Sequence, residues 1–378
     1  MKRKIFGSVF ATGSILCVLA IVISFNACNT QEVSSVIKPK VVTQPVKWDS
    51  DDPAIWINPD DPDKSLIIGT DKETDGALYV FDLDGNVIEE KTVRGLKRPN
   101  NVDVEYGLML GGQQVDIAVA TEREANSIRV YSLPDMKEID NGGIEVFAGT
   151  GQQAPMGVSL YKRPTDGAVF AIVSRKEGPT ENYLWQYLLE DDGSGVVKGI
   201  VVRKFGNYSG VKEIESIAVD DQLGYVYYSD EQIGVRKYYA DPDAPDADVQ
   251  LGIIHTQDYL EDNEGISIYC IDDKTGYILV SDQSANRFRI YPREGKPAVI
   301  DEEDLEDSEP AQPHIHKLIK IVNVSTNNSD GSDVTSVALG TKFPNGLFVA
   351  MSDNKTFQLY DWADIAGDDL VIASKMKK

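Results

Sequence analysis

The hydrophobic residues after position 46 fall in short runs rich in Val, Ile, Tyr and Phe, and clusters of Asp, Gly, Asn and Pro separate these runs. Alternation of this kind is typical of β-strands joined by tight turns. We find no amphipathic helical pattern of any length in this part of the sequence. The pattern therefore predicts an all-β body.

The predicted strands recur in a fixed order. Each repeat contains a strand that ends in an aromatic residue, and these residues lie 50, 56, 51, 53 and 69 positions apart: Phe81, Tyr131, Tyr187, Tyr238, Tyr291 and Tyr360. An apolar strand that ends in polar residues precedes each of them, and a third strand that opens with polar residues comes earlier still. Six repeats of several strands each indicate a six-bladed β-propeller.

The repeats predict one domain over residues 46–378. A single four-stranded blade cannot bury both of its faces, so the blades must stack around a common axis. Closure of the ring is expected to pair a strand near residues 40–50 with the last blade near residues 355–372. Seven blades are the main alternative to six.

The first residues are typical of an export signal. Three basic residues at positions 2–4 precede an uncharged, apolar stretch, and the sequence Phe25-Asn26-Ala27-Cys28 is similar to a bacterial lipobox. We predict a lipoprotein signal peptide over residues 1–27, acylation of Cys28 and a flexible tether over residues 28–45. The alternative is an uncleaved membrane helix, because the apolar run approaches the ~20 residues that cross a bilayer. In both cases the body is exported to the periplasm or cell surface, and only its N-terminus contacts the membrane.

The charge balance restricts the possible partners. The chain has 61 acidic and 37 basic residues, which gives a formal net charge of -24. Such an acidic surface repels phosphate backbones, so we expect no nucleic-acid partner. It suits a protein that collects cations, or one that only needs to stay soluble. With three cysteines and three histidines, the chain lacks the composition of a disulfide framework or a histidine-rich zinc enzyme.

Polar residues recur at one place in each repeat, where the inner strands are expected to point toward the mouth of the central channel. The early repeats supply the cations Lys72, Arg123 and Lys176. The later repeats supply carboxylates: Glu177, Glu215, Asp230, Glu231, Asp262, Glu264, Asp330 and Asp333. Crowded carboxylates repel one another unless a cation joins them, and all-oxygen ligands favour Ca²⁺. The Lys and Arg side chains would then bind an anion such as phosphate, which points to metal-assisted hydrolysis. Alternatively, each acid is an ordinary turn residue.

Two motifs carry a resemblance to a known family. Asp51-Asp52-Pro53-Ala54-Ile55-Trp56 and Asn100-Asn101-Val102-Asp103-Val104-Glu105-Tyr106, at their separation, resemble the two signature motifs of the β-propeller phytases. The likeness extends over residues 46–365. It implies a six-bladed phosphatase that needs several Ca²⁺ ions and acts on phytate (inositol hexakisphosphate) or another phosphate monoester. In that family, water attacks phosphorus directly.

The resemblance also implies roles for single residues. Lys72, Arg123 and Lys176 are similar to the family's phosphate-binding cations, and Glu177, Glu215 and Gln283 to the rest of its catalytic and substrate-binding shell. The implied calcium ligands are Asp52, Asp103, Glu177, Glu215, Asp230, Asp262, Glu264 and Asp333. Two departures weaken the substrate site: Glu73 stands where a second lysine is usual, and Met156 stands where a phosphate-contacting tyrosine is usual.

Two other functions are compatible with the pattern. The first is a calcium-dependent lactonase or phosphotriesterase; the three cations argue against it, because neutral esters need no cation clamp. The second is a non-catalytic propeller that binds a partner at the cell surface. Glu73 and Met156 mildly favour this second function, but the two motifs oppose it. A monomeric, exported phytase is therefore the function that the sequence predicts.

Overall fold

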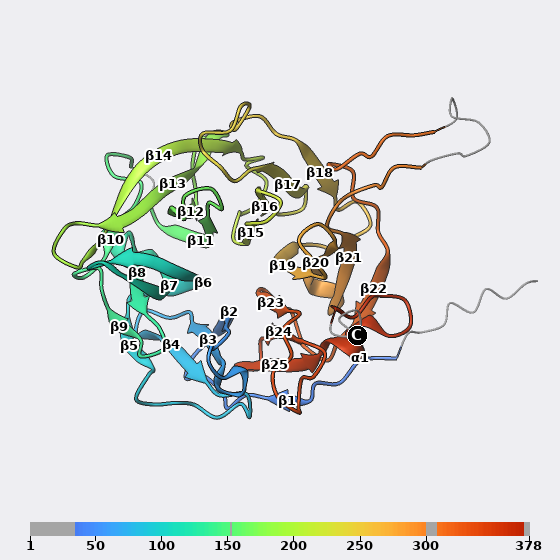
Figure 1. The fold of residues 1–378 in the computed structure, drawn as a ribbon, viewed down its shortest axis with the longest axis horizontal. Coiled ribbons are helices and arrows are strands. Elements are labelled where there is room, and N and C mark those ends of the chain that lie inside the picture. Colours follow the sequence, from blue (N-terminus) through green and yellow to red (C-terminus); the bar gives the residue numbers. More distant parts are fainter. Residues whose placement is uncertain (1–34, 152, 300–307, 374–378) are drawn as a thin grey trace, which may run out of the picture. The chain divides into compact units, whose positions relative to one another are not determined.

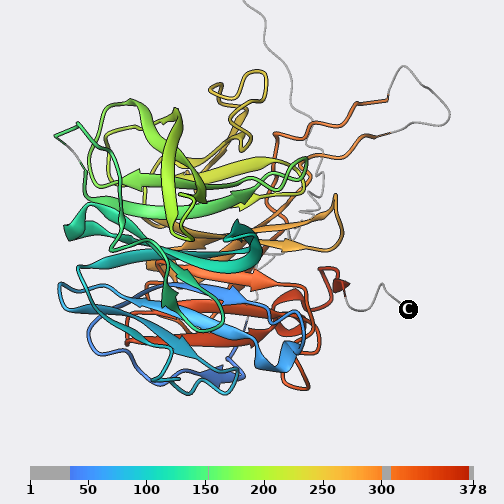
Figure 2. The same ribbon diagram turned by 60° about the vertical axis from the view of Figure 1, so that its left-hand side comes forward.

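The structure is a computed structural model that describes residues 35–151, 153–299 and 308–373. Sheets drawn from this part of the chain surround a common axis, and the turned view shows neighbouring sheets stacked face to face (Figures 1 and 2). The expected signal peptide and Cys28 lie outside the described residues. Within those residues, no helix has the length and apolarity needed to cross a bilayer.

Six antiparallel sheets are formed by the described residues, which confirms the six-bladed β-propeller. From the centre outward (Figure 1), the first blade contains β2 (Ser50–Trp56), β3 (Leu66–Asp71), β4 (Gly76–Phe81) and β5 (Val93–Leu96). The second contains β6 (Pro99–Leu110), β7 (Gln113–Glu122), β8 (Ser127–Ser132) and β10 (Ile144–Glu145), and β9 (Lys137–Glu138) also pairs with β8. The third contains β11 (Pro155–Lys162), β12 (Val169–Arg175), β13 (Glu181–Asp191) and β14 (Val197–Asn207).

The other three blades follow the same order. They contain β15 (Ile217–Asp220), β16 (Tyr225–Asp230), β17 (Gly234–Tyr239) and β18 (Gly252–His255); then β19 (Asn263–Cys270), β20 (Gly276–Asp282), β21 (Arg287–Pro292) and β22 (Lys320–Asn323); then β23 (Ser332–Thr335), β24 (Leu347–Ser352), β25 (Thr356–Asp361) and β1 (Val41–Val42). The helical segments among the described residues are short: η1 (Pro62–Lys64), η2 (Arg123–Ala125), η3 (Gln283–Ala285) and α1 (Trp362–Ala366).

The N-terminal segment closes the ring. β1 is the outer strand of the sixth blade, where Val41 lies opposite Leu359 of β25. One step earlier, Ile37 forms a bridge with Val324. The structure therefore includes residues from 35 onward in the propeller, whereas the sequence had suggested a tether up to residue 45.

The hydrophobic core is divided among the contacts between blades. The cluster between the second and third blades, for example, contains Val119, Val130, Ala171 and Trp185, all at most 5% exposed. The contact between the sixth and first blades is so close that a Cβ atom on Gly69 would lie 2.2 Å from the ring of Phe357. A fully buried side chain such as that of Phe357 contributes roughly 1.5–3 kcal/mol to stability. Packing between the blades is therefore the main source of stability.

Strand direction brings the polar ends of the repeats to one mouth of the channel. Because the two innermost strands of each blade are antiparallel, the start of one lies beside the end of the other. Ser50 is paired with Asp71 in the first blade, and Asn263 is paired with Asp282 in the fifth. Residues just outside these pairs therefore gather around the axis, although they are far apart in the sequence.

Candidate active site

Lys72 and Arg123 meet at the mouth of the channel. Lys72 follows β3, and its ammonium forms ion pairs with Asp51, with Glu215 at 3.5 Å and with Asp330 at 3.8 Å. Arg123 begins η2, and its Nη2 atom lies 4.0 Å from Oε1 of Glu215. Side chains from four blades thus converge at this point, as the repeat pattern had predicted for Lys72, Arg123 and Glu215.

Glu215 is the carboxylate that both cations share. Asn100 donates a hydrogen bond to Glu215 and accepts one from Arg123, so it links the two. Burial alone would raise the pKa of Glu215, but the charge of Lys72, the hydrogen bond from Asn100 and the charge of Arg123 outweigh it and lower that pKa. Glu215 is therefore an ionised, compensated group that holds two cations in place.

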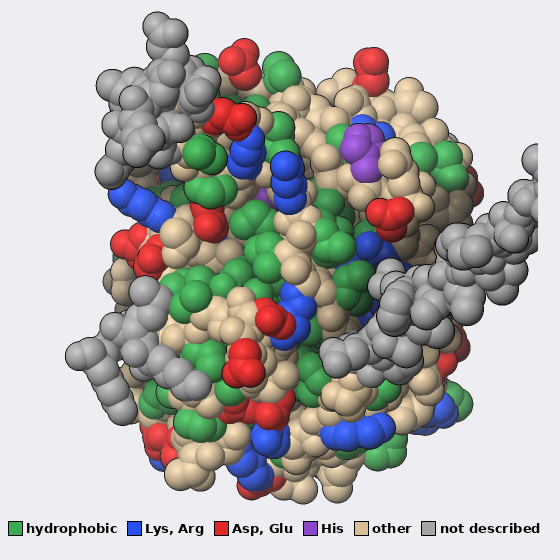
Figure 3. Space-filling model, turned by 90° about the vertical axis from the view of Figure 1, so that its right-hand side faces the viewer, with side chains coloured by type: hydrophobic (Ala, Val, Ile, Leu, Met, Phe, Trp, Pro, Cys, Tyr) green, Lys and Arg blue, Asp and Glu red, His purple; other side chains and the backbone are tan. Residues whose placement is uncertain are grey.

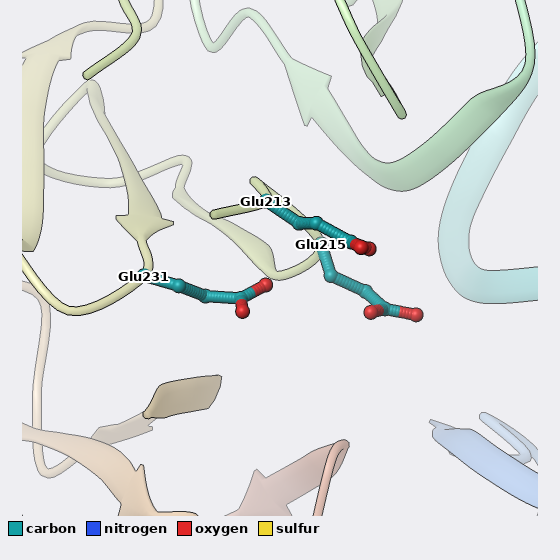
Figure 4. Close-up of side chains that lie close together, drawn as sticks. All are labelled: Glu213, Glu215 and Glu231. Atoms are coloured by element: carbon teal, nitrogen blue, oxygen red, sulfur yellow. The ribbon is translucent and has the colours of Figure 1, made fainter. Parts of the chain in front are cut away.

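More carboxylates lie beside Glu215. Oxygens of Glu213, Glu215 and Glu231 lie within 4.8 Å of one another, and so do oxygens of Glu231, Asp262 and Glu264. Figure 4 shows Glu213 and Glu215 on the segment before β15 and Glu231 on the segment after β16, with their carboxylates extending into the same space. Glu231 belongs to both groups, and we call these five residues the acidic cluster.

Three oxygens of the acidic cluster are buried without a hydrogen bond from the described residues. They are both carboxylate oxygens of Glu231, which is 1% exposed, and Oε2 of Glu264, which is 4% exposed. Oε2 of Glu231 has an ion-pair contact with Lys212 but no hydrogen bond. Burial raises the pKa of Glu231 to about 8, and burial with neighbouring acids raises that of Glu264 well above its usual value. A buried acceptor left open costs about 1–3 kcal/mol. Open acceptors on an all-oxygen set fit a hard divalent cation such as Ca²⁺.

Two lysines border the acidic cluster. Lys176 forms an ion pair with Glu213. Lys212 forms one with Asp262, and its Nζ atom lies 3.0 Å from Oε2 of Glu231. Positive side chains and carboxylates therefore lie together at the mouth, which is the combination that an anion bound through metal ions requires.

A second set of carboxylates lies deeper along the axis. Asp52, Asp103 and Asp333 line a cavity of about 120 Å³ between the inner strands. Backbone amides of those strands donate to them at 2.8–3.1 Å. Burial raises the pKa of all three, that of Asp333 to about 7. The structure thus places some of the expected ligands at the mouth and others inside the channel.

Asp230 lies outside the acidic cluster although it is fully buried. Arg236 donates to it at 2.8–2.9 Å, and Ser209 donates to its two oxygens at 2.6 and 3.0 Å. Successive side chains of an extended segment point to opposite sides, so its neighbour Glu231 reaches the cluster instead. The contacts of Asp230 are those of a structural residue.

Other expected site residues occupy the rim. Glu177 is exposed and lines a surface hollow together with Lys176, without joining the acidic cluster. Gln283 begins η3 and donates a hydrogen bond to Asp330. Met156 is completely buried, with its sulfur against the guanidinium of Arg123. Met156 therefore packs against Arg123, and its side chain is not accessible to a substrate.

Sequence reasoning did not single out Lys212, Glu213 or Asn100 as site residues. Their positions carried a usable signal, because Lys212 and Glu213 open the fourth repeat and Asn100 opens the second. The histidines are elsewhere: His255, His314 and His316 line a hollow of about 270 Å³ beside β18 and β21. The side of the ring in Figure 3 shows histidine among mixed acidic, basic and hydrophobic side chains.

Comparison with known proteins adds two matches. A family model described as Phytase matches residues 4–367. A 3-phytase from Bacillus subtilis (strain 168) is 31% identical over 333 residues, which cover 84% of this chain and 80% of that protein.

Proposed function

Because the chain belongs to the Phytase family, we propose that it is an exported, calcium-dependent phosphomonoesterase that hydrolyses phytate. The observation that supports this most is the acidic cluster, in which Glu231 and Glu264 keep open buried oxygens. A third member of the cluster, Glu215, pairs with the cations Lys72 and Arg123. An enzyme for a highly charged phosphate ester needs both features: carboxylates for metal ions and cations for phosphate oxygens.

The residues at the mouth of the channel have two proposed roles, metal binding and phosphate binding. Glu213, Glu215, Glu231, Asp262 and Glu264 are the candidates to hold Ca²⁺. When bound, Ca²⁺ would supply a water molecule of lowered pKa and neutralise charge on the phosphate. Asp52, Asp103 and Asp333 are candidates for a further ion inside the channel, where they line the axial cavity.

Lys72, Arg123 and Lys176 bind the phosphate in this proposal. Arg123 presents a planar fork that matches two phosphate oxygens, and Lys72 adds a compact charge. Both are held by Glu215 before substrate arrives, so little side-chain freedom is lost on binding. As negative charge shifts to the leaving oxygen, these cations stabilise it. Gln283, held by Asp330, lies at the rim where a second phosphate of the substrate could be oriented.

Export and lipid anchoring rest on the N-terminal sequence. The basic residues, apolar stretch and Cys28 support a lipoprotein signal. An oxidising, calcium-rich location outside the cytoplasm would supply the metal that the acidic cluster requires.

The direct test is phosphate release from phytate by the purified protein. We expect release in excess Ca²⁺, loss of release with a chelator, and recovery when Ca²⁺ is restored. Magnesium serves as the control cation, because its strict octahedral geometry suits a crowded carboxylate set less well. Absence of release in Ca²⁺ from a folded protein would contradict the proposal.

A further inference from the structure

Lys212 places a positive charge between carboxylates of the acidic cluster. Its ammonium lies 3.0 Å from Glu231 and also forms an ion pair with Asp262. These two carboxylates, with Glu264, form one of the two groups whose oxygens lie within 4.8 Å of one another. A single positive charge of this chain therefore already bridges two ligands of a candidate cation site.

The ammonium compensates this group incompletely. Oε1 of Glu231 and Oε2 of Glu264 remain without a hydrogen-bond partner among the described residues. Lysine offers one charge and three donors, whereas a divalent ion offers two charges and accepts six to eight oxygen ligands. A divalent ion could therefore satisfy the carboxylates that Lys212 leaves open, but it cannot share the space between Glu231 and Asp262 with the ammonium.

The segment that carries Lys212 allows the side chain to leave. The Lys212 side chain is 37% exposed, and its neighbour Val211 is 55% exposed. Gly210 has a left-handed φ of 73° with open space around its Cα atom. The fully buried Ile214 anchors the segment on the other side. Rotation of Lys212 toward solvent would thus disturb no packed core.

We propose that Lys212 is a built-in competitor of the divalent cation at Glu231, Asp262 and Glu264. In the absence of metal, the ammonium pairs with two of the three carboxylates and reduces the repulsion between them. Metal binds there by displacing the ammonium into solvent, so Lys212 sets the concentration of cation at which this part of the site fills. The inference rests on the proposed function only in assuming that the acidic cluster binds Ca²⁺.

Calcium titration of the chelator-treated protein by calorimetry tests the inference without any substrate. Lys212→Met removes the competing charge and keeps the apolar stem, so we expect its Kd for Ca²⁺ at this position to fall about tenfold, or about 1.4 kcal/mol. Lys198→Met is the matched control, because Lys198 pairs with Glu190 at 3.1 Å on an outer strand. This control is expected to bind Ca²⁺ as the wild type does. Unchanged or weaker binding by Lys212→Met would overturn the inference, since Lys212 would then only organise the carboxylates.

Chemical labelling of lysines gives a second measurement. If Ca²⁺ displaces the ammonium, the rate at which an amine-reactive ester labels Lys212 rises on Ca²⁺ addition, while the rate at Lys198 stays constant. A rate at Lys212 that is unchanged or falls would contradict displacement. A failure of the proposed function would give a different result. Either the wild type and Glu231→Gln would bind Ca²⁺ with equal affinity, or the protein would release no phosphate from phytate although Ca²⁺ is bound.

Discussion

Two regions of the molecule bury carboxylates in different ways. Between the blades, Asp220 is almost completely buried and accepts two hydrogen bonds of 2.6 Å from the guanidinium of Arg293. At the mouth of the channel, Glu231 and Glu264 are buried to a similar extent, yet each keeps at least one oxygen without a hydrogen bond from the described residues. Burial of a carboxylate is therefore common to structural and functional sites in this protein. What distinguishes the mouth of the channel is that open acceptors occur on two carboxylates of one acidic group, whereas the open oxygen of Asp361, at the start of α1, belongs to no such group among the described residues.

The largest expected effect concerns the pair of Asp220 and Arg293, in which both carboxylate oxygens have a donor. Arg293→Met leaves Asp220 buried without its partner, and we expect the free energy of unfolding to fall by about 3–5 kcal/mol. Urea denaturation measures this loss. Calcium affinity and phosphate release per folded molecule are expected to stay at wild-type values. A change in calcium affinity would show that the two regions are not separable.

Glu264→Gln is the converse experiment at the open site. The substitution removes a candidate ligand that has a buried oxygen without a hydrogen bond from the described residues, so calcium affinity and phosphate release are expected to fall by at least about 10–100-fold. In chelator, the variant is expected to unfold at the same denaturant concentration as the wild type or at a higher one, because no native hydrogen bond to the open oxygen is lost. Marked destabilisation of the metal-free variant would contradict the account.

Calcium is expected to stabilise the protein through the open site. At a free concentration 100 times its Kd, a ligand that binds only the folded state adds about 2.7 kcal/mol. Thermal unfolding with and without Ca²⁺ measures this shift. The shift is expected to persist in Arg293→Met and to shrink in Glu264→Gln. Equal shifts in both variants would place the calcium elsewhere.

The last expected effect concerns a buried cation and depends on pH. Lys237 is 2% exposed, with its ammonium 2.7 Å from the carbonyl oxygen of Pro313 and 3.3 Å from Nε2 of His316. Burial lowers the pKa of Lys237 to about 7, although Asp220 opposes the shift. The unfolded chain then binds more protons between pH 7 and 10.5, so stability is expected to rise across this window, by up to about 1.4 kcal/mol per pH unit.

Lys237→Met removes this dependence on pH. Urea denaturation of the wild type and the variant at pH 7, 8.5 and 10 compares the two slopes. We expect the curve of the variant to be flatter over the window. Parallel curves would mean that Lys237 stays charged when buried.

The fold could be predicted from the sequence because its determinants are repeated. Aromatic strand ends such as Tyr131 and Tyr187 recur at nearly constant spacing, and six such repeats admit few architectures. The meeting of Lys72, Arg123 and Glu215 was predictable for the same reason, since equivalent positions of each repeat reach one mouth.

The details of the site could not be predicted, because they depend on contacts between repeats. Asp230 and Glu231 are adjacent acids, and only the pairing of Asp230 with Arg236 decides which of them faces the channel. The contacts of Lys212 with Glu231 and Asp262 likewise join three different segments. Residue type and spacing indicate which charges gather at the mouth, but they do not indicate which charges compensate one another.

Asp230 and Glu231 also provide the most direct test of the central claim. Calorimetric titration of Ca²⁺ into Asp230→Asn and Glu231→Gln compares neighbouring acids that lose the same charge, with circular dichroism to verify that both variants fold. We predict wild-type affinity for Asp230→Asn and affinity at least about tenfold weaker for Glu231→Gln. Weaker binding by Asp230→Asn with unchanged binding by Glu231→Gln would contradict the claim that open buried carboxylates form the metal site.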